Sequence, residues 1–138
     1  IDVAGGFIHV AAHKAKTAQR RLVPILPNLA RWLAPYAKRR GKVWKGNIYD
    51  LQEARAETTK AAGVAWKSNG LRHSFVSYRL ADIQNAAQVA LEAGNSPTMV
   101  FKHYRELVKP SAAKAYFAIA PTHPANVLTM PEQTEAAQ

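Results

Sequence analysis

One arginine and one tyrosine in the second half of the chain could act together on a phosphate. Arg72 carries a planar guanidinium that fits phosphate oxygens, and Tyr104 carries a hydroxyl that can attack phosphorus. Lys16, in a loop nearer the N-terminus, could protonate the oxygen that leaves. Taken singly, each has a commoner role, because tyrosines usually pack, helix-start arginines usually form salt bridges and loop lysines are usually solvated. Their spacing along the chain therefore has to indicate whether they act together.

Sequence blocks between residues 69 and 104 fix that spacing. They read NGLRHSF from position 69, AGNS from position 93 and HY from position 103. Nearer the N-terminus, Lys16-Thr17 precedes the run RRLVP at positions 20 to 24. The pattern resembles the tyrosine recombinase (phage integrase) family, which reads H-x-x-R-H-T/S-F, then L-G-H-S, then a tyrosine nine residues after that second histidine. The resemblance covers about residues 1 to 118.

The resemblance implies DNA strand cleavage and rejoining. Tyr104 would attack the scissile phosphate, form a 3′-phosphotyrosine and release a 5′ hydroxyl, while Arg72 holds the phosphate. Lys16 would protonate the leaving oxygen, with Lys14 in its place if the loop is read two residues shorter. No metal or nucleotide cofactor is needed, because the phosphotyrosine conserves the bond energy. Double-stranded DNA is the implied partner.

The chain also departs from the family pattern. Asn69 and Asn95 occupy the positions of the two family histidines, and an amide cannot transfer a proton at neutral pH. Such a loss costs a factor of roughly 10² to 10⁴ in rate. The neighbouring His73 and His103 could substitute, although histidines there more often pack or bond to backbone. The family's first arginine lies upstream of the hairpin, before residue 1, and we expect the chain to be truncated there.

These departures leave three hypotheses open. The first is the catalytic portion of a recombinase or integrase, weak or inactive as this fragment. The second is a degenerate remnant that binds DNA without cutting it. The third is a chain that mainly self-associates through its C-terminal helix, since Tyr116 and Phe117 match the family element that packs on a neighbouring subunit. A core helix within one chain is the alternative for that element.

The charge balance favours a nucleic-acid partner. Nineteen Lys and Arg against nine Asp and Glu give a net charge of +10 and a pI near 10.2. A basic protein kept soluble by its charge, or one attracted to acidic lipid, is the alternative. Residues 14 to 45 hold no acid at all. The residues expected to contact DNA are Lys14, Arg20, Arg21, Lys38, Arg39, Arg40, Lys42, Lys45 and Lys102.

Composition also bounds the compartment. The chain has no cysteine, so disulfides and thiolate metal sites are excluded and a reducing cytosol is the simplest location. No apolar run is long enough to cross a bilayer, and the N-terminus does not read as a secretory signal. The five histidines show no close pairing with carboxylates, so no metal site is expected. We therefore expect a cytoplasmic, nucleoid-associated protein.

The predicted fold class is mainly α with a small antiparallel β-sheet (α+β), arranged as a recombinase catalytic domain by resemblance. Strands are predicted at 1–3, 7–11 and 21–25, forming a three-stranded meander. A helix from Pro27 presents Leu29, Trp32, Leu33 and Tyr36 on one face, and Pro35 ends or kinks it. Residues 1 to 119 form the domain, and 120 to 138 form a frayed tail.

Turn and cap residues divide the remaining helices. Asn47 is expected to cap a helix over 48–62 that ends at Gly63. Helices follow over 71–81, with Leu71, Phe75, Tyr78 and Leu80 inward, and over 84–93. Ser96 and Pro97 begin the helix that carries Met99, Val100, His103, Tyr104 and Leu107, and the last helix runs over about 110–119.

Overall fold

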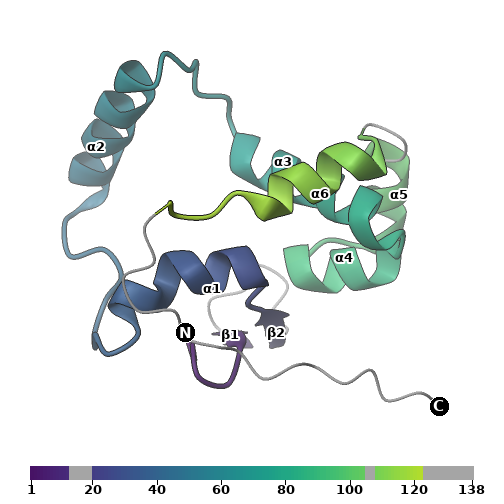
Figure 1. Cartoon of the computed structure of the whole chain (residues 1–138), viewed down its shortest axis with the longest axis horizontal. Coiled ribbons are helices and arrows are strands. Elements are labelled where there is room, and N and C mark those ends of the chain that lie inside the picture. Colours follow the sequence, from purple (N-terminus) through teal and green to yellow (C-terminus); the bar gives the residue numbers. More distant parts are fainter. Residues whose placement is uncertain (13–19, 105–107, 123–138) are drawn as a thin grey trace.

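A short antiparallel hairpin is followed by a series of helices in this computed structural model, which describes residues 1–12, 20–104 and 108–122. The predicted class, mainly helical with a small antiparallel sheet, is confirmed for these residues. Helices α3 to α6 gather on one side, α1 lies beside the hairpin and α2 stands apart (Figure 1). The elements are β1 (Phe7–Val10), β2 (Arg21–Pro24), α1 (Pro27–Leu33), the 3-10 helix η2 (Ala34–Tyr36), α2 (Ile48–Ala61), α3 (Gly70–Ile83), α4 (Ala86–Ala93), α5 (Pro97–Tyr104) and α6 (Pro110–Ala118).

The sheet has two strands where three were predicted. β1 and β2 pair antiparallel, with Ile8 opposite Val23. The strand predicted at residues 1 to 3 is wrong, because a single bridge joins Asp2 to Phe7. The Asp2 carboxylate accepts a hydrogen bond from the Gly5 amide at 2.8 Å, which turns the backbone sharply just after the bridge. The pairing of residues 1 to 3 with β1 is therefore limited to the bridge from Asp2 to Phe7.

Helices α3, α4 and α5 share the largest buried cluster. Val76 of α3, Val89 of α4 and Val100 of α5 are fully buried, and Ala90 and Tyr104 complete the contact. These helices carry the three sequence blocks that matched the family pattern. The core therefore fixes those blocks relative to one another.

Two predicted caps are present. Asn47 begins α2 by accepting the Asp50 amide at 3.1 Å, and the Asp50 carboxylate accepts the Asn47 amide at 2.8 Å. Ser96 begins α5 by accepting the Met99 amide at 3.3 Å. Gly94 ends α4 with a φ of 64°, a left-handed conformation that glycine adopts without strain.

Two predicted apolar faces are wrong in part. In α1 and η2 the buried residues are Ala30 and Ala34, whereas Trp32 and Tyr36 are 49% and 53% exposed. Leu71 is 69% exposed, because it lies about 140° around the helix from the buried Val76.

The last helix packs within its own chain. Tyr116 of α6 stacks on Tyr78 of α3 with ring centroids 4.1 Å apart, and Phe117 meets Phe75 edge to face at 6.5 Å. Burial, and then the neighbouring Tyr78, raise the pKa of Tyr116. This packing accounts for the aromatic residues of α6, so a homo-oligomer contact through that helix stays a prediction.

An ion pair joins α3 to α4. Arg79 donates from Nε and Nη2 to the two oxygens of Glu92, at 3.0 and 3.2 Å, and from Nη1 to Asp82 at 2.9 Å. Burial lowers the pKa of Arg79, but bonding to Glu92 and Asp82 outweighs it and the pKa is raised. Glu92 is 4% exposed, so its charge depends on Arg79 and on the Gln88 amide.

We predict that Glu92→Gln destabilises the fold by about 3 kcal/mol, because it leaves Arg79 buried beside a neutral amide. Urea unfolding measures the loss. Asp82→Asn is the matched control, since that carboxylate is more exposed and should cost about 1 kcal/mol or less. Equal losses in the two variants would contradict the assignment of the buried pair as the stronger tie.

Candidate active site

The first turn of α3 presents two candidate residues side by side in sequence. Asn69 precedes the helix with a φ of 54°, a left-handed conformation that asparagine tolerates better than most residues. Arg72 and His73 follow, and both are exposed. The Asn69 side chain makes no hydrogen bond to a described residue. The left-handed backbone conformation at position 69 therefore explains why an asparagine stands there.

Arg72 contacts the turn between α4 and α5. Its Nη2 donates to Oδ1 of Asn95 at 2.6 Å and lies 3.4 Å from the carbonyl oxygen of Gly94. Two predicted site residues, 23 positions apart, are thus brought together. An amide cannot transfer a proton, but its oxygen can hold the guanidinium in one orientation. The contact uses one nitrogen of Arg72, and its other donors bond to none of the described residues.

Tyr104, the last residue of α5, contacts His73. Its hydroxyl oxygen lies 2.6 Å from Nδ1 of the imidazole, and the rings are 5.6 Å apart. When the imidazole proton is on Nε2, Nδ1 accepts the hydroxyl proton. A hydroxyl bonded to an imidazole is the usual pairing of a nucleophile with its general base. Tyr104 is only 9% exposed, however, so the hydroxyl is sheltered by its own chain.

The histidine that meets Tyr104 differs from the one placed in the site from sequence. His103, adjacent to Tyr104, is exposed and makes no hydrogen bond to a described residue. His73 was considered only as a substitute. No spacing rule could have chosen between them, because the contact spans 31 residues and depends on how α5 packs against α3.

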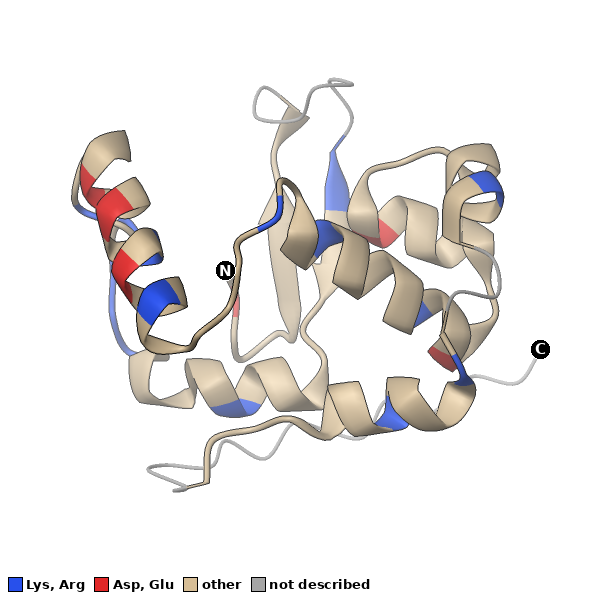
Figure 2. Cartoon of the chain, turned by 90° about the horizontal axis from the view of Figure 1, so that it is seen from above, with Lys and Arg blue, Asp and Glu red and all other residues tan. Residues whose placement is uncertain are grey.

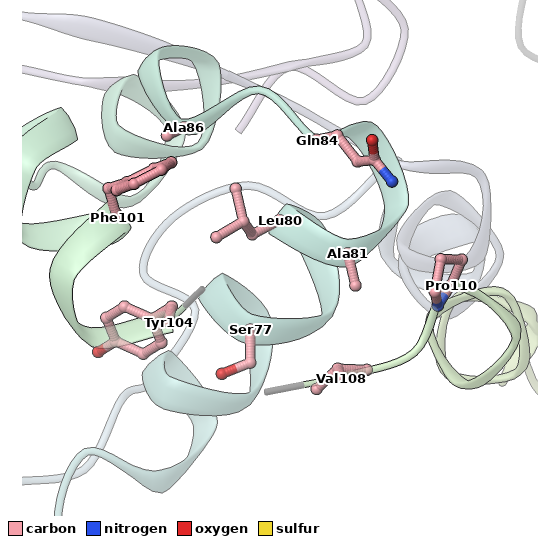
Figure 3. A pocket seen from close by; sticks show the side chains of 9 residues that line it. All are labelled: Ser77, Leu80, Ala81, Gln84, Ala86, Phe101, Tyr104, Val108 and Pro110. Carbon is pink, nitrogen blue, oxygen red and sulfur yellow. The ribbon is translucent and has the colours of Figure 1, made fainter. Parts of the chain in front are cut away.

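An apolar pocket of about 440 Å³ lies beside the tyrosine ring. Leu80 of α3 and Phe101 of α5 line it together with Tyr104 (Figure 3). The Tyr104 hydroxyl points away from the middle of this pocket. The Tyr104 ring packs with the apolar core, while its hydroxyl oxygen faces the first turn of α3.

β2 brings one more cation to the same turn. Arg21 places its guanidinium against Gly94, next to the residue that holds Arg72. Sequence reasoning assigned Arg21 to a general DNA-contacting surface. Its place at the α4–α5 turn follows from the packing of β2 on α4. This arginine is a site candidate that spacing alone did not find.

The remaining predicted DNA contacts divide between exposed residues and residues outside the described ranges. Lys14 and Lys16 lie outside the described residues. The segment from 38 to 45 joins η2 to α2 and is exposed throughout. Arg39 stacks over the Tyr36 ring at 5.0 Å, beside a cleft of about 800 Å³ that Trp32 also lines. Basic and aromatic side chains are thus interleaved there. Of the predicted DNA contacts, those that are described and exposed are Arg20, Lys38, Arg39, Arg40, Lys42, Lys45 and Lys102.

Acidic residues lie close to part of this basic surface. Asp50, Glu53 and Glu57 all lie on α2, which closely follows segment 38–45, and Figure 2 shows basic residues alongside that helix. Of the other described acids, Asp82 and Glu92 bond to Arg79, and Asp2 pairs with the start of β1. At the α4–α5 turn, Arg21 and Arg72 form no salt bridge with a described residue.

We predict that Tyr104→Phe destabilises the chain by about 1 kcal/mol, because it removes the hydrogen bond to His73. In a His73→Ala background the same change should cost close to nothing, since the bond is already absent. Urea unfolding of the four proteins gives the coupling energy. A cost for Tyr104→Phe that is the same with and without His73 would contradict the bond.

None of the helices in the described residues is long and apolar enough to span a membrane. Comparisons with protein-family models, with curated proteins and with solved structures found no match to this chain.

Proposed function

We propose that the chain is a catalytic domain of the tyrosine recombinase type, which cleaves and rejoins double-stranded DNA through a 3′-phosphotyrosine. A pair of neighbouring contacts carries the proposal. The Tyr104 hydroxyl bonds His73 at 2.6 Å, and Arg72, the residue before His73, is held by Asn95. Helix α5 thus supplies a nucleophile, Tyr104, and α3 supplies a base and a phosphate-binding cation, His73 and Arg72. The fold, the DNA partner and a cytoplasmic, nucleoid-associated location follow from this function.

The reaction begins when the Tyr104 oxygen attacks phosphorus and gives its proton to Nδ1 of His73. The 5′ oxygen of the next nucleotide leaves as the bond to phosphorus breaks, and it needs a proton, which Lys16 would supply. Arg72 binds the non-bridging oxygens with the donors that Asn95 does not occupy. Rejoining is the reverse: a 5′ hydroxyl attacks the phosphotyrosine and Tyr104 is released.

Asn95 acts as a positioning residue in this scheme. Its oxygen fixes Arg72, and no proton passes through it. Loss of an acid–base group costs a factor of roughly 10² to 10⁴ in rate, so slow cleavage is expected. His73 offsets part of this loss at the nucleophile, but it offers no replacement at the phosphate oxygens.

Burial of Tyr104 sets a second condition. A side chain that is 9% exposed cannot meet a DNA backbone from outside. The Tyr104 side chain must move outward from its place between α3 and α5 when DNA binds, with its hydroxyl still bonded to the exposed His73. DNA binding and exposure of the nucleophile are therefore linked steps.

A second function, DNA binding without cleavage, is favoured by two observations. The Tyr104 hydroxyl is sheltered, and neither family histidine position holds a group that transfers protons. The exposed basic segment from 38 to 45 serves this function as well as the first. The two functions differ only in whether Tyr104 reacts.

We predict a covalent adduct between the chain and a DNA substrate that carries a nick next to the cleavage site, which traps the intermediate. The adduct is resolved by denaturing gel electrophoresis and should disappear in Tyr104→Phe. Tyr49→Phe is the control, because that tyrosine lies on α2 and is 76% exposed. DNA binding with no adduct, and with equal affinity in Tyr104→Phe, would support the non-cleaving function instead.

We also predict that replacing Arg39, Arg40 and Lys42 by glutamine weakens DNA binding and flattens its salt dependence. Each lost phosphate contact should reduce the slope of log K against log salt by about 0.9. The control changes Lys60, Lys67 and Lys114 to glutamine, which removes the same charge from other elements. Equal effects of the two triple changes would show that net charge, and not segment 38–45, governs binding.

A further inference from the structure

The guanidinium of Arg21 lies flat against a glycine. A β-carbon built on Gly94 would stand 2.7 Å from Cζ, 2.7 Å from Nη1 and 3.0 Å from Nη2 of this arginine. Near-equal distances to three atoms of the planar group mean that its face covers the α-carbon. A side chain at position 94 would push the Arg21 guanidinium out of this stack. The left-handed φ of 64° at Gly94 adds a second requirement for glycine at this position.

Arg21 is held without being neutralised. Its Nε is buried and has no hydrogen-bond partner among the described residues. Its side chain forms no salt bridge with any of them, since the arginine-bound carboxylates, Asp82 and Glu92, both belong to Arg79. An arginine that only supported the fold would normally bond a carbonyl or a carboxylate. Here the donors of a partly buried guanidinium have no hydrogen-bond partner among the described residues.

Two guanidinium groups therefore meet at one turn. Arg72 contacts the Gly94 carbonyl and Asn95 from the α3 side, and Arg21 covers Gly94 from the β2 side. The C-terminal end of α4 contributes about half a negative charge, which offsets only part of two full positive charges. The surplus charge and the guanidinium donors suit a tetrahedral dianion or a phosphodiester, whose oxygens accept several N–H bonds at once.

We infer that Arg21 and Arg72 form a phosphate-binding site across the Gly94–Asn95 turn, with Arg21 as its second guanidinium. The inference deepens the proposed function by naming a second arginine that contacts the phosphate. It also stands apart from that function, because anion binding needs neither Tyr104 nor cleavage. Gly94 serves the site by letting the Arg21 plane approach the backbone.

The test measures binding of inorganic phosphate to the full chain by isothermal titration calorimetry at constant ionic strength. Arg21→Gln should weaken phosphate binding by about tenfold or more, the effect of losing one charged hydrogen bond. Arg31→Gln is the matched control, because it removes the same charge from an exposed arginine of α1. It should change the affinity less than about twofold, as expected for a distant, screened charge.

A second measurement covers the case in which Arg21→Gln does not fold. The arginine Nε–H resonances of the unmodified chain are followed by NMR during a phosphate titration, with chloride at equal ionic strength as the reference. The Nε–H signals assigned to Arg21 and Arg72 should shift with phosphate and not with chloride. Loss of affinity that is equal in Arg21→Gln and Arg31→Gln, or an Arg21 signal that does not respond, would overturn the inference.

The outcomes also separate the inference from the proposed function. Phosphate binding that survives in Tyr104→Phe, together with no covalent DNA adduct, would leave the site standing and remove cleavage. An adduct that forms while phosphate fails to bind at Arg21 would retain cleavage and remove the site.

Discussion

The contact of two arginines with one glycine turn organises the candidate site. Gly94 ends α4 in a left-handed conformation, Asn95 follows with its oxygen on Arg72, and Arg21 covers the glycine from the hairpin. Three segments that are far apart in sequence thus converge on two residues. A side chain at position 94 would displace Arg21, strain the turn and shift the residue that orients Arg72. The turn therefore couples the hairpin, α3 and the start of α5.

The buried core keeps this turn in register with Tyr104. Val89 of α4 and Val100 of α5 lie on either side of the turn and pack against Val76 of α3. Because α5 starts at the turn and ends at Tyr104, its length sets how far the tyrosine lies from Arg72. A rigid helix between the two groups gives a defined geometry, whereas a loop would let them drift. The same core explains why Tyr104 is sheltered: its ring is part of the packing that positions it.

Local signals in the sequence predicted the elements well, and long-range packing set the limits. The Asn47, Ser96 and Gly94 boundaries depend on backbone groups a few residues away, so residue types alone indicate them. The strand predicted at residues 1 to 3 does not form, because the Asp2 carboxylate turns the chain. No alternation of apolar residues reveals that contact. At the site, spacing indicated Arg72 and Asn95, which the structure brings into contact. Spacing did not indicate the contacts of His73 and Arg21, because these depend on how α5 and β2 pack.

Helix α2 differs from every other helix in the described chain, because none of its residues is buried. Isolated helices of this length are marginal in water, so the capping pair of Asn47 and Asp50 must supply much of its order. Its opening free energy is then small, and it can melt and re-form while α3 to α6 stay folded. The described chain thus combines a buried core, shared by α3, α4 and α5, with a solvent-exposed helix, α2, that adds nothing to that core.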